Sequence, residues 1–227
     1  MIGSHLSKRT QLLCVAIMMC NQGCRHATSS QPTSAIHLNL ADDTSASCND
    51  QRPAYIRLVV PLICSLDKSR DWLTLSRLDC VSTPFHDRRP VVSRDNLIRI
   101  LTNNLKAPAR ENGTAFHKFW KWVADQHHEA GLVVIVITDG IGDGMSRTDY
   151  EMLHAAIRKL AASNDLRAVA LLGIDPSVMN ETAKEFEPIS KRLGTRGFLM
   201  MTKGDIDPEP LQELLQNARI PDGKDGK

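Results

Sequence analysis

Hydrophobic and polar residues alternate with changing periods along most of this chain. Between residues 35 and 40, Ile36, Leu38 and Leu40 alternate with polar residues, and this period of two indicates a strand. Residues 132–137 are all Leu, Val or Ile, which is typical of a short strand buried on both faces. Further strands are predicted at 72–78, 168–174 and 197–201.

Segments with helical spacing separate these predicted strands. Ser146 and Asp149 form a capping-box pattern ahead of an apolar helical stripe. One more helix is expected to follow Thr114 and to stop at Gly131. The other predicted helices are 51–66, which contains Pro61; one with Ser93 as N-cap and Leu97, Ile98, Leu101 and Leu105 as its stripe; 177–194, which contains Pro188; and a last one with Asp207 as N-cap and Pro208 at its first position.

Strands that alternate with helices predict an α/β fold, here a Rossmann-like open, mostly parallel sheet with helices on both faces. Ligands of such sheets bind outside the carboxyl ends of the strands. A functional site is therefore expected in the loops that follow Leu40, Ile137 and Ile174.

The first 34 residues have a different character. Lys8 and Arg9 precede an apolar run over residues 12–20, and this order predicts an export signal rather than a disordered leader. The run is about half of the roughly 20 residues that span a bilayer. Cys24 after Gly23 resembles a bacterial lipoprotein cleavage site, where that cysteine receives lipid. The predicted division is 1–24 signal, 25–34 polar tether, 35–219 one domain and 220–227 disordered tail.

Charge and cysteine content narrow the classes of partner. The formal net charge is +2 and no dense Lys/Arg stripe is present, so nucleic-acid binding is not indicated. Cys48, Cys64 and Cys80 match no zinc-binding spacing. One disulfide with a free thiol and three separate thiols both remain open.

Two loops and one turn at the expected edge of the sheet carry oxygen-bearing side chains. Asp43, Ser45 and Ser47 alternate along the loop after the first strand, and alternate residues of an extended loop point the same way. Asp139 follows the buried strand, and Thr114 stands just before a helix. Two carboxylates and three hydroxyls are hard ligands, which favours Mg²⁺ or Mn²⁺ and leaves a coordination position for water or an outside carboxylate.

These motifs resemble the metal-ion-dependent adhesion site of the von Willebrand factor type A family. That site combines Asp-x-Ser-x-Ser, a Gly-Thr before a middle helix and a Thr-Asp-Gly after a buried strand. The resemblance covers roughly residues 35–219 and implies a protein-binding module that is not an enzyme. It implies that Ser45, Ser47 and Thr114 contact the ion, while Asp43 and Asp139 act directly or through water. An Asp or Glu of a protein partner would complete the site.

The sequence departs from the family pattern at three places. Cys48 stands where the family often has methionine, Pro61 interrupts the first helix, and no hairpin of the second and third strands is evident between residues 72 and 92. These departures concern local geometry. The partner and the oligomeric state are not specified by the sequence.

Other readings compete with the metal site. Residues 140–144 are rich in glycine between a strand and a helix, which allows nucleotide or phosphate binding, although Met145 replaces the last glycine of the dinucleotide pattern. Hydrolysis by Ser45 or Ser47 lacks a Gly-x-Ser-x-Gly elbow. A domain of this fold that binds partners without metal is a further alternative. Residues 67–71 resemble the first motif but are interpreted as a polar turn.

Overall fold

The computed structural model describes most of the chain beyond residue 33. The described residues are 34–48, 50–78, 84–90, 93–105, 115–128, 130–140 and 145–220. The predicted signal, with Cys24 as its predicted lipidation site, and nearly all of the predicted tether and tail lie outside them. Within the described residues, no helix is long and apolar enough to cross a membrane.

Six strands form one sheet in the described part of the chain, in the order β3-β2-β1-β4-β5-β6. Neighbouring strands are parallel, except that β3 runs antiparallel to β2. The short β3 is the hairpin partner of β2 that the sequence did not reveal, because three residues carry too little periodicity. The bounds are β1 (Ile36–Asp42), β2 (Trp72–Arg77), β3 (His86–Arg88), β4 (Gly131–Ile137), β5 (Leu166–Ile174) and β6 (Phe198–Thr202).

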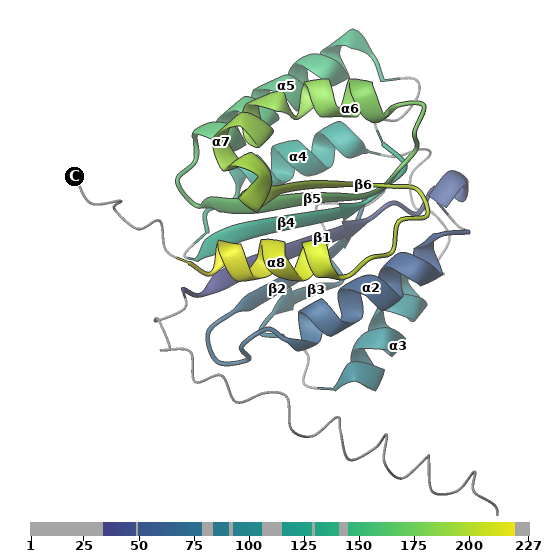
Figure 1. Cartoon of the computed structure of the whole chain (residues 1–227), viewed down its shortest axis with the longest axis vertical. Helices are drawn as coiled ribbons and strands as arrows, with labels where there is room; N and C mark the ends of the chain where they lie inside the picture. Colours follow the sequence, from purple (N-terminus) through teal and green to yellow (C-terminus); the bar gives the residue numbers. More distant parts are fainter. Residues whose placement is uncertain are drawn as a thin grey trace, which may run out of the picture. The chain divides into compact units, whose positions relative to one another are not determined.

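Helices cover both faces of this sheet, which confirms the predicted open α/β architecture (Figure 1). One face packs against α2, α3 and α8, and the other against α4, α5 and α7. The bounds are a one-turn 3₁₀ helix η1 (Ala46–Cys48), α2 (Arg52–Cys64), α3 (Arg94–Leu105), α4 (Phe116–Asp125), α5 (Arg147–Ala162), α6 (Met179–Glu185), α7 (Glu187–Gly197) and α8 (Glu209–Ala218).

The central strand β4 shows why a continuous apolar run was needed. Val133, Ile135 and Ile137 lie in the core beneath α2 and α8. Their neighbours Val134 and Val136 lie in the opposite core, beneath α4 and α5. Both faces of β4 are therefore removed from water, as expected for a central strand of a parallel sheet.

Two helices confirm their predicted signals. The Ser146 side chain accepts from the backbone N–H of Asp149, and the Asp149 side chain accepts from that of Ser146, so the capping box is complete. The helix predicted to follow Thr114 is α4, in which Phe116, Phe119 and Trp120 are fully buried in the core.

Several predicted boundaries are wrong. The helix predicted over 177–194 is two helices, because the chain leaves helical geometry at buried Phe186 and restarts with Pro188 in the first turn of α7. Gly131 begins β4 and does not end α4, which already stops at Asp125. The predicted Asp207 cap is displaced by one position, since α8 begins at Glu209.

Three further predictions concern the buried face of α3, the proline in α2 and the cysteines. Ile98 is 38% exposed and does not belong to the buried stripe of α3, whereas Leu97 and Leu101 do. Pro61 lies inside α2 without ending it. Buried Cys48 and exposed Cys64 are both free thiols, and Cys80 lies outside the described residues.

Candidate metal centre

The carboxyl ends of β1, β4 and β5 meet at one edge of the sheet, as the fold class requires. Backbone hydrogen bonds continue past the strands: Asp43 N–H donates to Ile137 O at 2.8 Å, and Asp175 N–H donates to Asp139 O at 2.8 Å. The loops after the three strands are therefore held in register. This brings Asp43 and Asp139 together across the edge.

Asp43 is buried, at 1% exposure, and its carboxylate is held by both loops. Its Oδ1 accepts a hydrogen bond from the Ser45 backbone N–H at 2.9 Å. Its Oδ2 accepts from the Thr138 hydroxyl at 3.2 Å. The orientation of the carboxylate is therefore set before any ligand arrives, which lowers the ordering cost of binding.

The two serines of the first motif are brought together by η1. Cys48 N–H donates to Ser45 O at 3.3 Å and closes this turn. The Ser45 and Ser47 hydroxyl oxygens lie 2.9 Å apart. The predicted convergence of these hydroxyls is confirmed, but its expected cause, an extended loop, is wrong.

Arg52, in the first turn of α2, holds the backbone of the loop that follows β1. Its guanidinium donates to Asp43 O at 2.8 Å and to Ser45 O at 3.3 Å. Its Nε lies 2.9 Å from Asp42 Oδ2 in a buried ion pair. Burial raises the pKa of Asp42, and the Arg52 charge acts in the opposite direction. The Asp42 carboxylate thus faces Arg52. Of these two adjacent aspartates, Asp43 is the one whose carboxylate lies in the cluster at the carboxyl edge.

Asp139 is half-buried and is followed by a glycine that the turn requires. Gly140 has a φ of 130°, which a side chain rarely tolerates. A Cβ there would also lie 2.6 Å from Val178 Cγ2. The Thr-Asp-Gly motif therefore combines the predicted ligand Asp139 with the residue that lets the chain turn away after it.

Cys48 belongs to the same cluster, and the sequence did not assign it a role. Ligand atoms of Asp43, Cys48 and Asp139 all lie within 4.8 Å of one another. The Cys48 thiol is hydrogen-bonded to the Ser45 side chain and the Asp139 backbone. Burial, followed by the nearby Asp43 and Asp139 charges, raises the pKa of this thiol to about 12. Its position directly after Ser47 in the motif was the only signal that could have found it.

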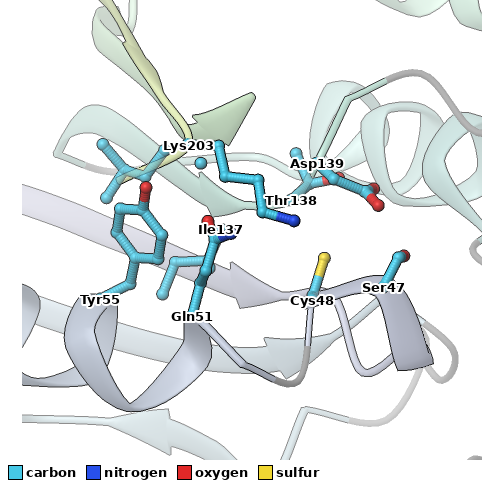
Figure 2. Close-up of a pocket in the computed structure, with 10 residues that line it drawn as sticks. Ser47, Cys48, Gln51, Tyr55, Ile137, Thr138, Asp139 and Lys203 are labelled. Carbon is cyan, nitrogen blue, oxygen red and sulfur yellow. The ribbon is translucent and has the colours of Figure 1, made fainter. Parts of the chain in front are cut away.

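A pocket opens beside the cluster, and Lys203 lies at its rim (Figure 2). Lys203 is exposed and follows β6, whose loop is fixed because the Tyr55 hydroxyl donates to Thr202 O at 3.2 Å. No local signal along the chain pointed to this residue. The pocket is lined by Ser47, Cys48, Gln51, Tyr55, Ile137, Thr138, Asp139, Leu172, Gly173 and Lys203.

Two predicted elements of the edge cannot be placed. Thr114 and residues 141–144 of the glycine-rich loop lie outside the described residues. The next residue after Thr114, Ala115, donates its backbone N–H to Leu78 O at 3.2 Å, beyond the carboxyl end of β2. Of the five predicted ligands, Asp43, Ser45, Ser47 and Asp139 are therefore seen, and they share one edge.

Two solved structures share this fold at low sequence identity. One is a mutant of the PilB minor pilin from Streptococcus sanguinis, with 10% identity and a TM-score of 0.52, covering 85% of this chain and 62% of that chain. The other is proximal thread matrix protein 1 from the mussel byssus, with 12% identity and a TM-score of 0.50, covering 83% and 46%.

This chain spans less than two thirds of the length of either structure, and identities this low support the α/β fold alone. No protein-family model matches the sequence, and no curated protein matches it either.

Proposed function

We propose that this chain is a divalent-cation-dependent protein-binding module of the von Willebrand factor type A kind. The observation that carries the proposal is the convergence of Asp43, Asp139 and the paired hydroxyls of Ser45 and Ser47 at the ligand-binding edge of the sheet. A core-packing role does not account for two carboxylates and two hydroxyls beside an open pocket.

The donor set fits a small hard cation. Asp43, Ser45, Ser47 and Asp139 present oxygen atoms, which are the ligands that Mg²⁺ and Mn²⁺ prefer. The carboxylate of Asp43 is oriented by Ser45 N–H and Thr138, so it serves an ion directly or through water. When bound, the ion would supply a positive point of attachment for an acidic side chain.

The proposed partner is therefore a protein that presents an Asp or Glu. Mg²⁺ takes six oxygen ligands and usually keeps some water, so an outside carboxylate can replace one water. The role proposed is binding and not catalysis. The domain of residues 35–219 would act as a rigid platform for it.

The proposed setting is outside the cytoplasm. The order of basic residues, apolar run and Gly23-Cys24 supports export, with lipid on Cys24 and residues 25–34 as the tether. The two structures of the same fold are named for a pilus and a byssal thread. Cys24→Ser should release the protein from the membrane fraction, and a variant that still sediments with membranes would contradict the anchor.

A matched pair of variants tests the metal site. Mg²⁺ and Mn²⁺ are titrated calorimetrically into the wild type, Asp43→Asn and Asp67→Asn. Asp67 is the control because it forms a similar turn with Ser69 on the surface. Affinity should fall at least about 100-fold in Asp43→Asn and stay unchanged in Asp67→Asn. Absence of saturable binding in the wild type, or equal affinity in both variants, would contradict the proposal.

The open coordination position is tested with Mn²⁺ as the probe. Bound Mn²⁺ speeds the relaxation of its coordinated water protons. A short peptide that contains Asp should reduce this effect by displacing water, and the same peptide with Asn should not. Equal responses to the two peptides would mean that the ion does not receive an acidic partner.

A further inference from the structure

The thiol of Cys48 lies inside the proposed metal site and not beside it. It is 6% exposed, and its sulfur is within 4.8 Å of carboxylate oxygens of both Asp43 and Asp139. Figure 2 shows the sulfur directed from η1 toward Thr138 and Asp139 across the pocket. Two polar groups already hold it there, the Ser45 side chain and the Asp139 backbone.

These separations are close to those between ligands of a single ion. With metal–oxygen bonds of about 2.1 Å and metal–sulfur bonds of about 2.3 Å, ligand atoms on one ion lie roughly 3–4.5 Å apart. Asp43, Cys48 and Asp139 come from two different loops, after β1 and β4, yet their ligand atoms meet within 4.8 Å, close to the upper end of that range. Only small side-chain adjustments separate this arrangement from shared coordination.

The nature of the sulfur ligand changes which ion is preferred. Mg²⁺ takes oxygen ligands, whereas thiolate selects softer ions, with zinc foremost among common divalent ions. We propose that Cys48 is a metal ligand together with Asp43 and Asp139, and that the site prefers a thiophilic divalent cation of the Zn²⁺ class to Mg²⁺. This inference rests on the proposed function, because it concerns the same site, and it specifies the ion.

A thiolate-bearing site has an excess of negative charge, which Lys203 can offset. Asp43, Asp139 and a Cys48 thiolate carry three negative charges against the two positive charges of the ion. Lys203, whose side chain lines the same pocket, offsets the remaining charge. As the metal–sulfur bond forms, the thiol proton passes to solvent, so binding releases a proton and no oxidation occurs.

Cobalt reports a metal–sulfur bond directly. Co²⁺ bound to a thiolate gives a sulfur-to-cobalt charge-transfer band in the near ultraviolet, and Co²⁺ bound only by oxygen does not. The reduced full chain is titrated with Co²⁺ as wild type, Cys48→Ser and Cys64→Ser. Cys64 is the matched control because it is a free, exposed thiol at the end of α2. The band should appear in wild type and Cys64→Ser and vanish in Cys48→Ser.

Affinities then separate the two proposals. The Zn²⁺ affinity should fall at least about 10-fold in Cys48→Ser, while the Mg²⁺ and Mn²⁺ affinities should stay within a few-fold of wild type. Binding of Mg²⁺ or Mn²⁺ with no thiolate band overturns the Cys48 assignment and leaves the proposed function standing. Failure of every ion to bind overturns both.

A measurement on the wild type keeps the test valid if Cys48→Ser does not fold. X-ray absorption at the zinc edge of the one-to-one complex should show one sulfur at about 2.3 Å with oxygen neighbours. A shell of oxygen alone would overturn the proposal. A shell of several sulfurs would also overturn it, since it would place the ion on other cysteines of the chain.

Discussion

Asp43-Thr44-Ser45 and Asp67-Lys68-Ser69 form the same local turn at opposite edges of the sheet. In each, the aspartate Oδ1 accepts a hydrogen bond from the backbone N–H two residues later, at 2.9 Å. Asp43 follows β1, whereas Asp67 lies in the turn ahead of β2. Because β1 and β2 are parallel, the first turn lies at the carboxyl edge and the second at the amino edge.

The two turns differ in what their serines do. The Ser69 hydroxyl donates to its own Asp67 at 2.7 Å, so both groups satisfy each other at the surface. The Ser45 hydroxyl instead lies 2.9 Å from Ser47, and Asp43 bonds across to Thr138. The same short motif is thus self-contained at Asp67, whereas at Asp43 its side chains bond to Ser47 and Thr138 of the carboxyl edge.

Each edge contains a buried ion pair, which is Arg52–Asp42 at the carboxyl edge and Arg219–Asp71 at the amino edge. Asp71, at 0% exposure, accepts from both terminal nitrogens of Arg219, at 3.1 and 2.5 Å. It also accepts from the backbone N–H of Ile36 at 3.0 Å and of Asp67 at 2.7 Å. The Asp71 carboxylate thereby joins residues of β1, the turn before β2 and the end of α8. These bonds indicate a structural role for the Asp71–Arg219 pair.

Removing the positive charge of Arg219 from this buried pair should have the largest effect on the free energy of unfolding. Arg219→Met keeps the apolar stem but leaves the Asp71 charge buried without its ion partner. The free energy of unfolding should fall by about 3–5 kcal/mol. Urea denaturation followed by circular dichroism measures the change, and metal affinity of the folded variant should not alter.

Two further variants establish that burial is the cause. Arg70→Ala removes a pair with Asp67 whose side chains are more than 40% exposed, so the loss should stay below about 1 kcal/mol. Adding Asp71→Asn to Arg219→Met should recover part of the loss, because no charge is then buried. Equal destabilisation by Arg70→Ala and Arg219→Met would show that burial of the ion pair is not the cause of the loss.

The sequence was sufficient to predict the strand–helix order and the edge of the site. Long periodic or continuous apolar segments such as β4, and the capping box of α5, carry their signal locally. The helix predicted over 177–194 is interrupted at Phe186, which lies between α6 and α7. Its burial depends on tertiary packing, so no local pattern indicated the interruption. The three residues of β3 are defined only by pairing with β2.

The residues of the proposed metal site stand in local sequence motifs, whereas the pocket beside them is formed by the fold. Asp43, Ser45, Ser47 and Asp139 stand in short motifs that can be recognised along the chain. Lys203 follows β6, which pairs with β5, and reaches the pocket only through the fold. Cys48 stood next to a motif residue, but nothing local indicated that its thiol faces two carboxylates.

A second prediction concerns pH and the amino end of β1. The Thr74 hydroxyl donates to Asp87 at 2.8 Å, so the His37 Nε2–H must donate to Thr74, 2.7 Å away. His37 Nδ1 then accepts from His128 Nδ1–H at 3.0 Å. Burial, followed by the charge of His128, lowers the pKa of His37 to about 4, and Asp87 opposes this shift.

The folded state therefore binds fewer protons than the unfolded state between pH 6.5 and about 4. The stability contributed by neutral His37 is present above pH 6.5 and is lost as pH falls through that window, by up to about 3 kcal/mol. Urea denaturation at pH 7 and pH 4.5 should show a steeper loss for wild type than for His37→Gln. Parallel losses would refute this role of His37.

The smallest expected effect returns to the carboxyl edge, where Lys203 supplies the only charge of its sign among the residues lining the pocket. Its ammonium repels any divalent ion there but also supports a negative thiolate. In Lys203→Met, repulsion alone is relieved for Mn²⁺ bound by oxygen, so Mn²⁺ affinity should rise a few-fold, equivalent to less than about 1 kcal/mol. For Zn²⁺, the lost support for the Cys48 thiolate offsets this gain, and the affinity should change less.

Calorimetric titration of both ions into wild type and Lys203→Met measures the affinity ratio of the two proteins for each ion. Equal gains for Mn²⁺ and Zn²⁺ would mean that Lys203 acts on the ion alone and not on the sulfur that binds it.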